Sequence, residues 1–226
     1  MTILRSELSS NDIVRLAGIG CKYVGEGAVG RIKRLLIALM LPILLTSCYL
    51  PESFTIDLSM ERNGDYRLSY RGLLVQPNIT QGLLDGSLDA TAEKERVAIV
   101  LADLKRDSGI KQINYTSRGV FNVVYEKRGN IMREKSFVFV RRNSRILEMF
   151  FHKDRNTVEI RGGFVPDQYQ DRLDALGYQM IGKIEFRTTA GIRSHNAAEF
   201  KEIGGQNRLR WEIKSISDPV PNVIIG

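Results

Sequence analysis

A short basic run followed by an uninterrupted apolar segment divides this chain of 226 residues into two unequal parts. Arg31, Lys33 and Arg34 precede residues 35–45, which include no polar side chain. In a helix this segment rises only about 16 Å, whereas a bilayer core is about 30 Å thick, so it is too short to span a membrane stably. A basic run, a short apolar segment and small residues after it are typical of a secretory signal peptide. We therefore expect the folded domain to lie in the part of the chain that follows.

The residues after the apolar segment predict a more specific processing site. Leu45-Thr46-Ser47-Cys48 resembles the lipobox of bacterial lipoproteins, in which an aliphatic residue and two small residues precede a cysteine. The resemblance implies cleavage between Ser47 and Cys48 and attachment of diacylglycerol, with palmitate-type acyl chains, to the thiol of Cys48. Two or more acyl chains anchor a protein stably, so Cys48 is the expected membrane attachment and a transmembrane helix is not needed. The alternative interpretation is a buried core helix that carries an incidental cysteine.

Processing at Cys48 determines the expected domain organisation. The expected parts are a presequence with the signal peptide (1–47), a single domain (48–217) and a C-terminal tail (218–226). The tail is expected because Pro219 and Pro221 cannot continue a sheet. If translation begins at Val29, the signal peptide has an ordinary length and residues 1–28 are not translated.

Alternating side chains predict a β-hairpin over residues 54–75. Apolar residues occupy positions 54, 56, 58 and 60 and alternate with polar ones, which is the period of two of a half-buried strand. Asn63-Gly64 predicts a tight two-residue turn in which both residues have positive φ. After this turn, apolar residues at 66, 68 and 70 alternate with Arg67, Ser69 and Arg71.

Two helices and a run of strands are predicted for the rest of the domain. The first helix spans about residues 91–107, because Val97, Val100 and Leu104 fall on one face. The second helix begins near Pro166 and ends at Gly177. Strands are predicted at 110–117, 120–127, 135–141, 145–153, 156–161, 181–188 and 208–216. The pattern predicts an α+β fold, with a mostly antiparallel curved β-sheet and two helices packed on one face.

The sequence favours a protein that is not an enzyme and binds no metal or cofactor. Its two histidines, His152 and His195, have no cluster of acidic residues around them at a metal-ligand spacing. His152 is expected at a strand edge and His195 in a turn. No nucleophile elbow, zinc-protease motif or phosphate-binding loop occurs. The formal charge of +7 falls to +4 for residues 48–226, with 27 basic and 23 acidic side chains, so we expect no nucleic-acid partner.

Two further features have two interpretations each. Lys127-Arg128 and Arg141-Arg142 are either turn ends that project into solvent or contacts for anionic lipid headgroups. Trp211 lies in an alternating segment that places its side chain on the buried face, together with 209 and 213. It is either a core anchor or the wall of a ligand cavity.

The order of motifs over residues 53–216 resembles the LppM-type lipoprotein domain. The resemblance rests on a first strand of the form Phe-Thr-Ile-Asp-Leu, an Asn-Gly-Asp turn, a central helix and a late set of residues. That late set is Gly191, Ser194-His195-Asn196-Ala197, Gly204-Gly205 and Trp211. The resemblance implies an α+β domain of the cell envelope without catalytic residues. In that family a C-terminal membrane segment often follows, whereas this sequence ends at Gly226.

Together these features predict a lipid-anchored protein on the periplasmic face of the cell envelope, which acts as a binding or assembly component. An envelope protein or a lipid is its expected partner, besides the membrane that Cys48 enters. The alternative function is a lipid- or amphiphile-binding domain with an internal cavity between sheet and helices. Tyr49 follows the cysteine in place of aspartate, which favours the outer membrane in a Gram-negative cell.

Overall fold

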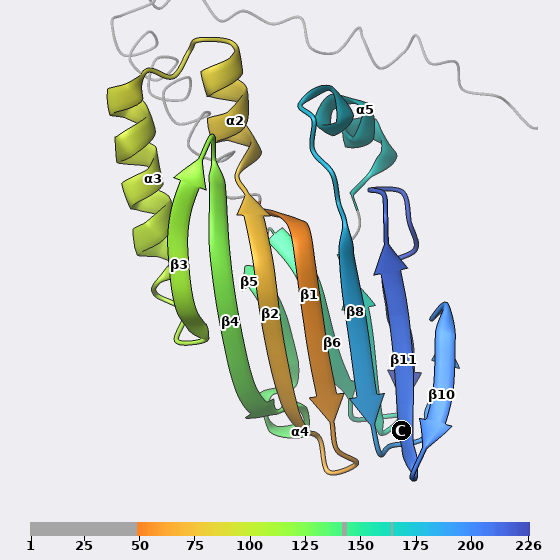
Figure 1. Ribbon diagram of the computed structural model, residues 1–226. Coiled ribbons are helices and arrows are strands. Elements are labelled where there is room, and N and C mark those ends of the chain that lie inside the picture. Colours follow the sequence, from red (N-terminus) through yellow and green to blue (C-terminus); the bar gives the residue numbers. More distant parts are fainter. Residues whose placement is uncertain (1–48, 142–143, 164) are drawn as a thin grey trace, which may run out of the picture. The chain divides into compact units, whose positions relative to one another are not determined.

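The computed structural model describes residues 49–141, 144–163 and 165–226, all within one compact unit. The strands in this part of the chain form two sheets (Figure 1). In spatial order, the larger sheet contains β10 (Glu199–Ile203), β11 (Gln206–Ile213), β8 (Gly182–Thr188), β1 (Leu50–Met60), β2 (Asp65–Val75), β4 (Val120–Asn130) and β3 (Ile110–Ser117). The smaller sheet contains β5 (Ser136–Arg141), β6 (Ser144–His152), β7 (Thr157–Gly162), β12 (Asn222–Ile225) and β9 (Ile192–His195). Neighbouring strands are antiparallel except for the parallel pair β1–β8.

The predicted hairpin is confirmed as β1 and β2, but its turn differs from the prediction. Ile56, Leu58 and Tyr70 face the core, and each is at most 1% exposed. The loop is longer than two residues, because Glu61 accepts a hydrogen bond from Gly64 N (2.9 Å) and donates one to the carbonyl of Asp65 (2.8 Å). Only Gly64 has a positive φ in this loop, so the two-residue turn was a wrong prediction. The side chain of Asn63 accepts from Asp65 N (3.0 Å), an Asx turn that stabilises the longer loop.

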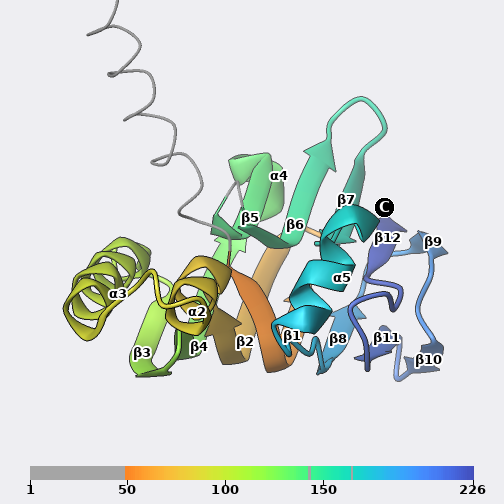
Figure 2. The same cartoon turned by 90° about the horizontal axis from the view of Figure 1, so that it is seen from above.

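Aromatic side chains hold the two sheets together. The ring of Phe139 on β5 lies 5.0 Å from that of Tyr70 on β2 and 4.5 Å from that of Tyr125 on β4. Figure 2 shows the smaller sheet above one face of the larger sheet. The α+β class with mostly antiparallel strands is therefore confirmed. The second sheet covers the inner face of the larger sheet, where the sequence suggested helices.

Both predicted helices are present, and two shorter ones accompany them. The expected helices are α3 (Ala90–Leu104) and α5 (Asp167–Ala175), and the additional ones are α2 (Pro77–Leu84) and α4 (Ile131–Glu134). Asp89 caps α3 by accepting from Thr91 N (2.9 Å) and Ala92 N (2.8 Å). The additional helices escaped prediction because eight and four residues are too few to show a period of 3.6. No helix in the described part of the chain is long and apolar enough to cross a membrane.

The expected C-terminal tail is wrong for its last residues. Asn222–Ile225 forms β12, which lies between β7 and β9 in the smaller sheet. Val223 and Ile225 are almost completely buried, as a strand alternation predicts. Pro219 and Pro221 do prevent a strand where they stand, but a proline does not stop a strand from beginning just after it.

Candidate functional site

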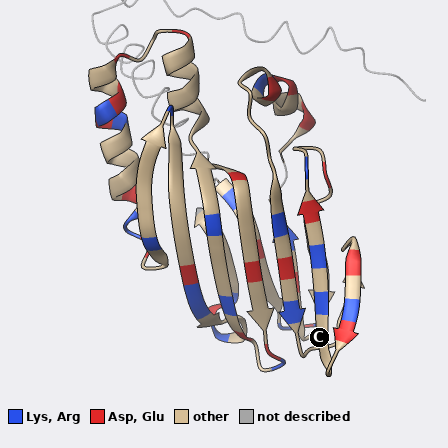
Figure 3. Ribbon diagram, viewed as in Figure 1, with Lys and Arg blue, Asp and Glu red and all other residues tan. Residues whose placement is uncertain are grey.

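The outer face of the larger sheet carries most of the charged side chains of the strands. Figure 3 shows acidic and basic bands on the strands of the larger sheet, with blue, red and blue in succession along β8. The inner face of the same strands is apolar, with Leu68, Phe121 and Leu209 fully buried. Because side chains of a strand alternate between faces, one apolar side of the sheet forces the polar residues onto the other. The outer face is therefore the polar face of this sheet.

A groove of about 630 Å³ lies on this face, over β2, β4 and the start of β3. We call it the basic groove. The residues that line it are Arg67, Leu68, Ser69, Arg71, Ser108, Lys111, Glu126, Lys127 and Arg128. Four of these residues, Arg67, Arg71, Lys111 and Arg128, are cationic with side chains on this side of the sheet, and only Glu126 is acidic. Lys127 is the direct partner of the buried Leu68, so its side chain points to the other face. The groove therefore has a strong excess of positive charge, which favours an anionic ligand.

Two arginines in the basic groove lie directly opposite each other on neighbouring strands, and no carboxylate of the described residues is paired with either. Arg67 and Arg128 are direct partners across β2 and β4, so their Cβ atoms are about 4.5–5.5 Å apart. Neither forms an ion pair with any residue that the structure describes. The carboxylate of Glu126 lies 3.4 Å from Arg71 instead. Like charges directly opposite each other destabilise a sheet, so this arrangement is unfavourable until an anion lies between the two guanidinium groups.

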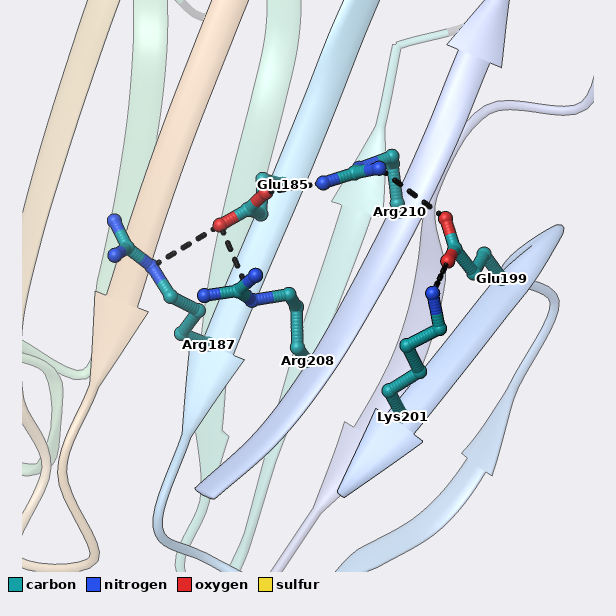
Figure 4. A network of polar contacts seen from close by, with 6 residues as sticks. All are labelled: Glu185, Arg187, Glu199, Lys201, Arg208 and Arg210. Atoms are coloured by element: carbon teal, nitrogen blue, oxygen red, sulfur yellow. Dashed lines mark hydrogen bonds and ion pairs between the residues drawn. The ribbon is translucent and has the colours of Figure 1, made fainter. Parts of the chain in front are cut away.

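The opposite half of the same face is arranged differently. Figure 4 shows an ion-pair cluster formed by Glu185, Arg187, Glu199, Lys201, Arg208 and Arg210. Glu185 lies at its centre, 3.4 Å from Arg187, 3.5 Å from Arg208 and 3.2 Å from Arg210. Glu199 contacts Lys201 and lies 3.3 Å from Arg210. The hydrogen bond and charge of Lys201, together with the arginines, hold the pKa of Glu199 below its usual value. The cations of this ion-pair cluster are thus compensated by carboxylates of the protein itself.

The two histidines form local contacts in different parts of the fold. Nε2 of His152 lies 3.0 Å from the carboxylate of Glu159, which also binds Arg161. Although burial opposes it, these two partners hold the pKa of Glu159 below its usual value. Nδ1 of His195 accepts from Ala197 N (3.2 Å) at the end of β9. Among the described residues, no three His, Cys, Asp or Glu side chains gather into a group that could hold a metal ion.

Trp211 has the environment of a core anchor. It is 2% exposed between Leu209 and Ile213, as the alternation predicts. Its indole N–H donates to the side-chain oxygen of Asn196 (3.1 Å), which also accepts from Asn222 N (2.8 Å). Asn196 therefore links β11 to β12, which gives the residue next to His195 a structural role.

A recess of about 380 Å³ lies at another part of the surface. Apolar side chains of Met60, Met132, Val158 and Ile225 contribute to its lining. Glu61, Arg62 and three glycines also line it, so its surface is mixed in polarity. The cavity predicted between sheet and helices corresponds in position to a smaller pocket of about 190 Å³, whose lining includes Leu84 of α2 and Leu173 of α5.

The predicted site residues have different outcomes. Ser47 and Cys48 lie outside the described residues, as does Arg142. Lys127 and Arg128 are not turn ends, because β4 continues to Asn130, and they line the basic groove. Sequence reasoning noted that Arg67 and Arg71 share one face of a strand but missed that they lie beside Arg128. The distant pairing of β2 with β4 brings them together, and no local pattern reports it.

Comparisons with known proteins find a weak similarity among the solved structures. No protein-family model and no curated protein matches the chain. Among solved structures, the folded domain of LppM from Mycobacterium tuberculosis is similar, with a TM-score of 0.33 and 11% identity. The similarity covers 79% of this chain and 92% of that one. A similarity this weak does not establish that the chain belongs to the LppM-type family.

Proposed function

We propose that this protein is a lipid-anchored binding component of the bacterial cell envelope, which binds an anionic ligand in its basic groove and is not an enzyme. The observation that carries the proposal is the opposed pair of Arg67 and Arg128, which have no carboxylate partner among the described residues. Because two like charges placed opposite each other destabilise the folded protein, we infer that this arginine pair serves to bind an anion.

The chemistry of the groove suits phosphate or carboxylate groups. A guanidinium group presents a planar fork of donors that matches both anions with two parallel hydrogen bonds. Arg67 and Arg128 can approach one anion from two strands, and Arg71 and Lys111 lie on the same lining. Both opposed arginines are exposed, so salt is expected to weaken the interaction strongly.

Removal of the opposed arginines tests the proposed site. We expect Arg67→Gln/Arg128→Gln to weaken the binding of inorganic triphosphate by about tenfold or more, because hydrogen bonds to charged groups contribute roughly 1.5–3 kcal/mol each. The measurement is isothermal titration calorimetry of the full chain at constant ionic strength. The melting temperature should not fall, because the change removes a like-charge contact.

Arg96→Gln/Arg172→Gln is the matched control. It removes two exposed arginines from α3 and α5, away from the groove, and leaves the same net charge. If both double variants weaken triphosphate binding equally, the protein attracts anions by its overall charge, and the groove is not a site.

The lipid anchor is a separate part of the proposal, supported by the basic run, the apolar segment and the lipobox-like residues before Cys48. The folded domain begins directly after that cysteine, since β1 starts at Leu50. Cys48→Ser should abolish palmitate labelling and leave an unprocessed precursor, whereas Cys21→Ser should be labelled and cut normally. Labelling that persists without Cys48 would exclude this anchor. Tyr49 after the cysteine supports the outer membrane as the location in a Gram-negative cell.

The recess lined by Met60 and Met132 favours a second candidate function, the binding of an amphiphile. Its size of about 380 Å³ lies within the range of small-ligand pockets. Native mass spectrometry of the protein purified from membranes tests this function, because a carrier should retain a lipid as a fixed mass increment. Protein that is free of lipid after gentle extraction would argue against it.

A further inference from the structure

One residue from each of six strands lies in a single row across the outer face of the larger sheet. The row follows from the strand registers, which pair each residue directly with the next. In spatial order its members are Arg128 on β4, Arg67 on β2, Ser59 on β1, Arg187 on β8, Arg208 on β11 and Lys201 on β10. We call it the basic row. Five of its six members are cations, and the sixth is a serine.

The basic row has the dimensions of an extended ligand. Neighbouring strands are about 4.8 Å apart, so five steps between six strands give a length of about 24 Å. One end of the row is the opposed pair of arginines in the basic groove, and the other end is Lys201 on the edge strand β10. The row is therefore much longer than a single phosphate group and runs perpendicular to the strands.

A second row, two residues away along each strand, is mainly acidic. Its members are Glu126, Ser69, Asp57, Glu185, Arg210 and Glu199 in the same spatial order. Arg187 and Arg208 of the basic row turn towards Glu185 of this acidic row. Those contacts have distances of 3.4 and 3.5 Å, and the side chains of both arginines are more than a third exposed. An anion that lies over the basic row can compete for these cations, since such exposed pairs are weak.

We propose that the basic row binds a linear polyanion that lies across the strands, beginning in the basic groove and extending to β10. This inference rests on the proposed function, because the groove supplies the uncompensated arginines where the ligand binds first. Arg187, Arg208 and Lys201 then exchange part of their contacts with Glu185 and Glu199 for contacts with the ligand. Affinity therefore grows with the length of the polyanion.

The same face argues for a polyanion without aromatic bases. Single-stranded nucleic acids are bound by stacking their bases on exposed aromatic side chains, in addition to backbone contacts. The large aromatic residues of β1, β2, β4, β8 and β11 instead point into the core. They are Phe54, Tyr66, Tyr70, Phe121, Tyr125, Phe186 and Trp211. Phe200 on β10 is 46% exposed, but it is the direct partner of the buried Leu209 and therefore lies on the opposite face of the sheet from the basic row. The ligand that fits is therefore a flexible chain of phosphate or carboxylate groups.

The test compares inorganic triphosphate with linear polyphosphate long enough to span the basic row, both titrated against the full chain at constant ionic strength. The long chain should bind more tightly. Lys201→Gln/Arg208→Gln should weaken its binding by about tenfold while changing triphosphate binding less than about twofold. Arg67→Gln/Arg128→Gln should weaken the binding of both ligands, and the α3 and α5 control Arg96→Gln/Arg172→Gln neither. An oligo-uronate of equal length identifies whether phosphate or carboxylate is preferred, and tight binding of either one supports the row.

Three results would overturn the inference. If triphosphate requires Arg67 and Arg128 but the long chain binds no better, the groove is a compact anion site and the row has no role. If Lys201→Gln/Arg208→Gln leaves long-chain binding unchanged, the ligand does not reach β10. If single-stranded DNA of equal charge binds as tightly as polyphosphate, the assignment to a polyanion without bases is wrong. A failure of the proposed function would give a fourth, distinct result. Triphosphate binding would then not depend on Arg67 and Arg128.

Discussion

The two halves of the outer face are built by the same strand alternation but differ in whether their cations are paired with carboxylates. In the β8–β11–β10 half, Glu185 lies within 3.5 Å of three guanidinium groups. In the β2–β4 half, Arg67 and Arg128 face each other and have no such carboxylate among the described residues. Similar residue types thus form a compensated surface in one place and an uncompensated one in the other.

The two halves are expected to contribute to the free energy of folding with opposite signs. Exposed ion pairs contribute about 0.2–1 kcal/mol each to folding, and a like-charge pair across two strands costs a similar amount. The compensated half therefore makes a small favourable contribution, whereas the opposed arginines make a small unfavourable one. The proposed binding site thus combines a small cost to folding with cations that no carboxylate of the described residues holds, beside a groove of about 630 Å³.

The largest expected change comes from removing the centre of the compensated half. Glu185→Gln leaves Arg187, Arg208 and Arg210 without their shared carboxylate, so this half should come to resemble the β2–β4 half. We expect a loss of about 1 kcal/mol in the free energy of unfolding, from weak contacts that act as a network. We also expect tighter binding of long polyphosphate, measured by titration calorimetry alongside thermal unfolding.

Glu95→Gln on the exposed surface of α3 is the control for this experiment, because it makes the same change in net charge away from the sheet face. Glu185→Gln should increase long-chain affinity more than the control does. Equal increases would mean that the ion-pair cluster does not restrain its cations, and the contrast between the two halves would then have no functional meaning.

The faces of individual strands could be predicted from the sequence. Alternation placed Arg67, Ser69 and Arg71 on one side of β2, and the structure shows their neighbours Leu68 and Tyr70 in the core. The same reasoning placed Trp211 on the buried face of β11. These predictions succeed because the period of two is a local property of the backbone and one face of each strand is apolar.

The candidate site could not be predicted, because it depends on which strands are neighbours. Arg67 meets Arg128 only through the β2–β4 register, and Ser59 meets Arg187 only through the parallel β1–β8 pair. Both pairings join segments that are far apart in the chain. The sequence also predicts a strand that ends at residue 127, which leaves Arg128 in a turn. In the structure the strand continues until Asn130 caps α4 by accepting from Arg133 N (3.1 Å).

A smaller effect, with a defined sign, is expected from pH. The hydrogen bond and charge of Lys201, with the arginines, lower the pKa of Glu199 in the folded protein. The stabilising contribution of Glu199 is therefore fully present above the usual carboxylate pKa of 4.5 and is lost as the pH falls through the lower folded value. Protonation then releases Lys201 at the β10 end of the basic row.

Long polyphosphate should consequently bind about twofold more tightly once the pH falls below the folded pKa of Glu199, a small change because these groups are exposed and screened by salt. Glu199→Gln should show this tighter binding already at pH 7 and lose the corresponding step in its pH profile. Other carboxylates titrate in both proteins, so the difference between the two profiles isolates Glu199. If the profiles coincide, Glu199 does not control access to Lys201, and the compensation of this half depends on Glu185 alone.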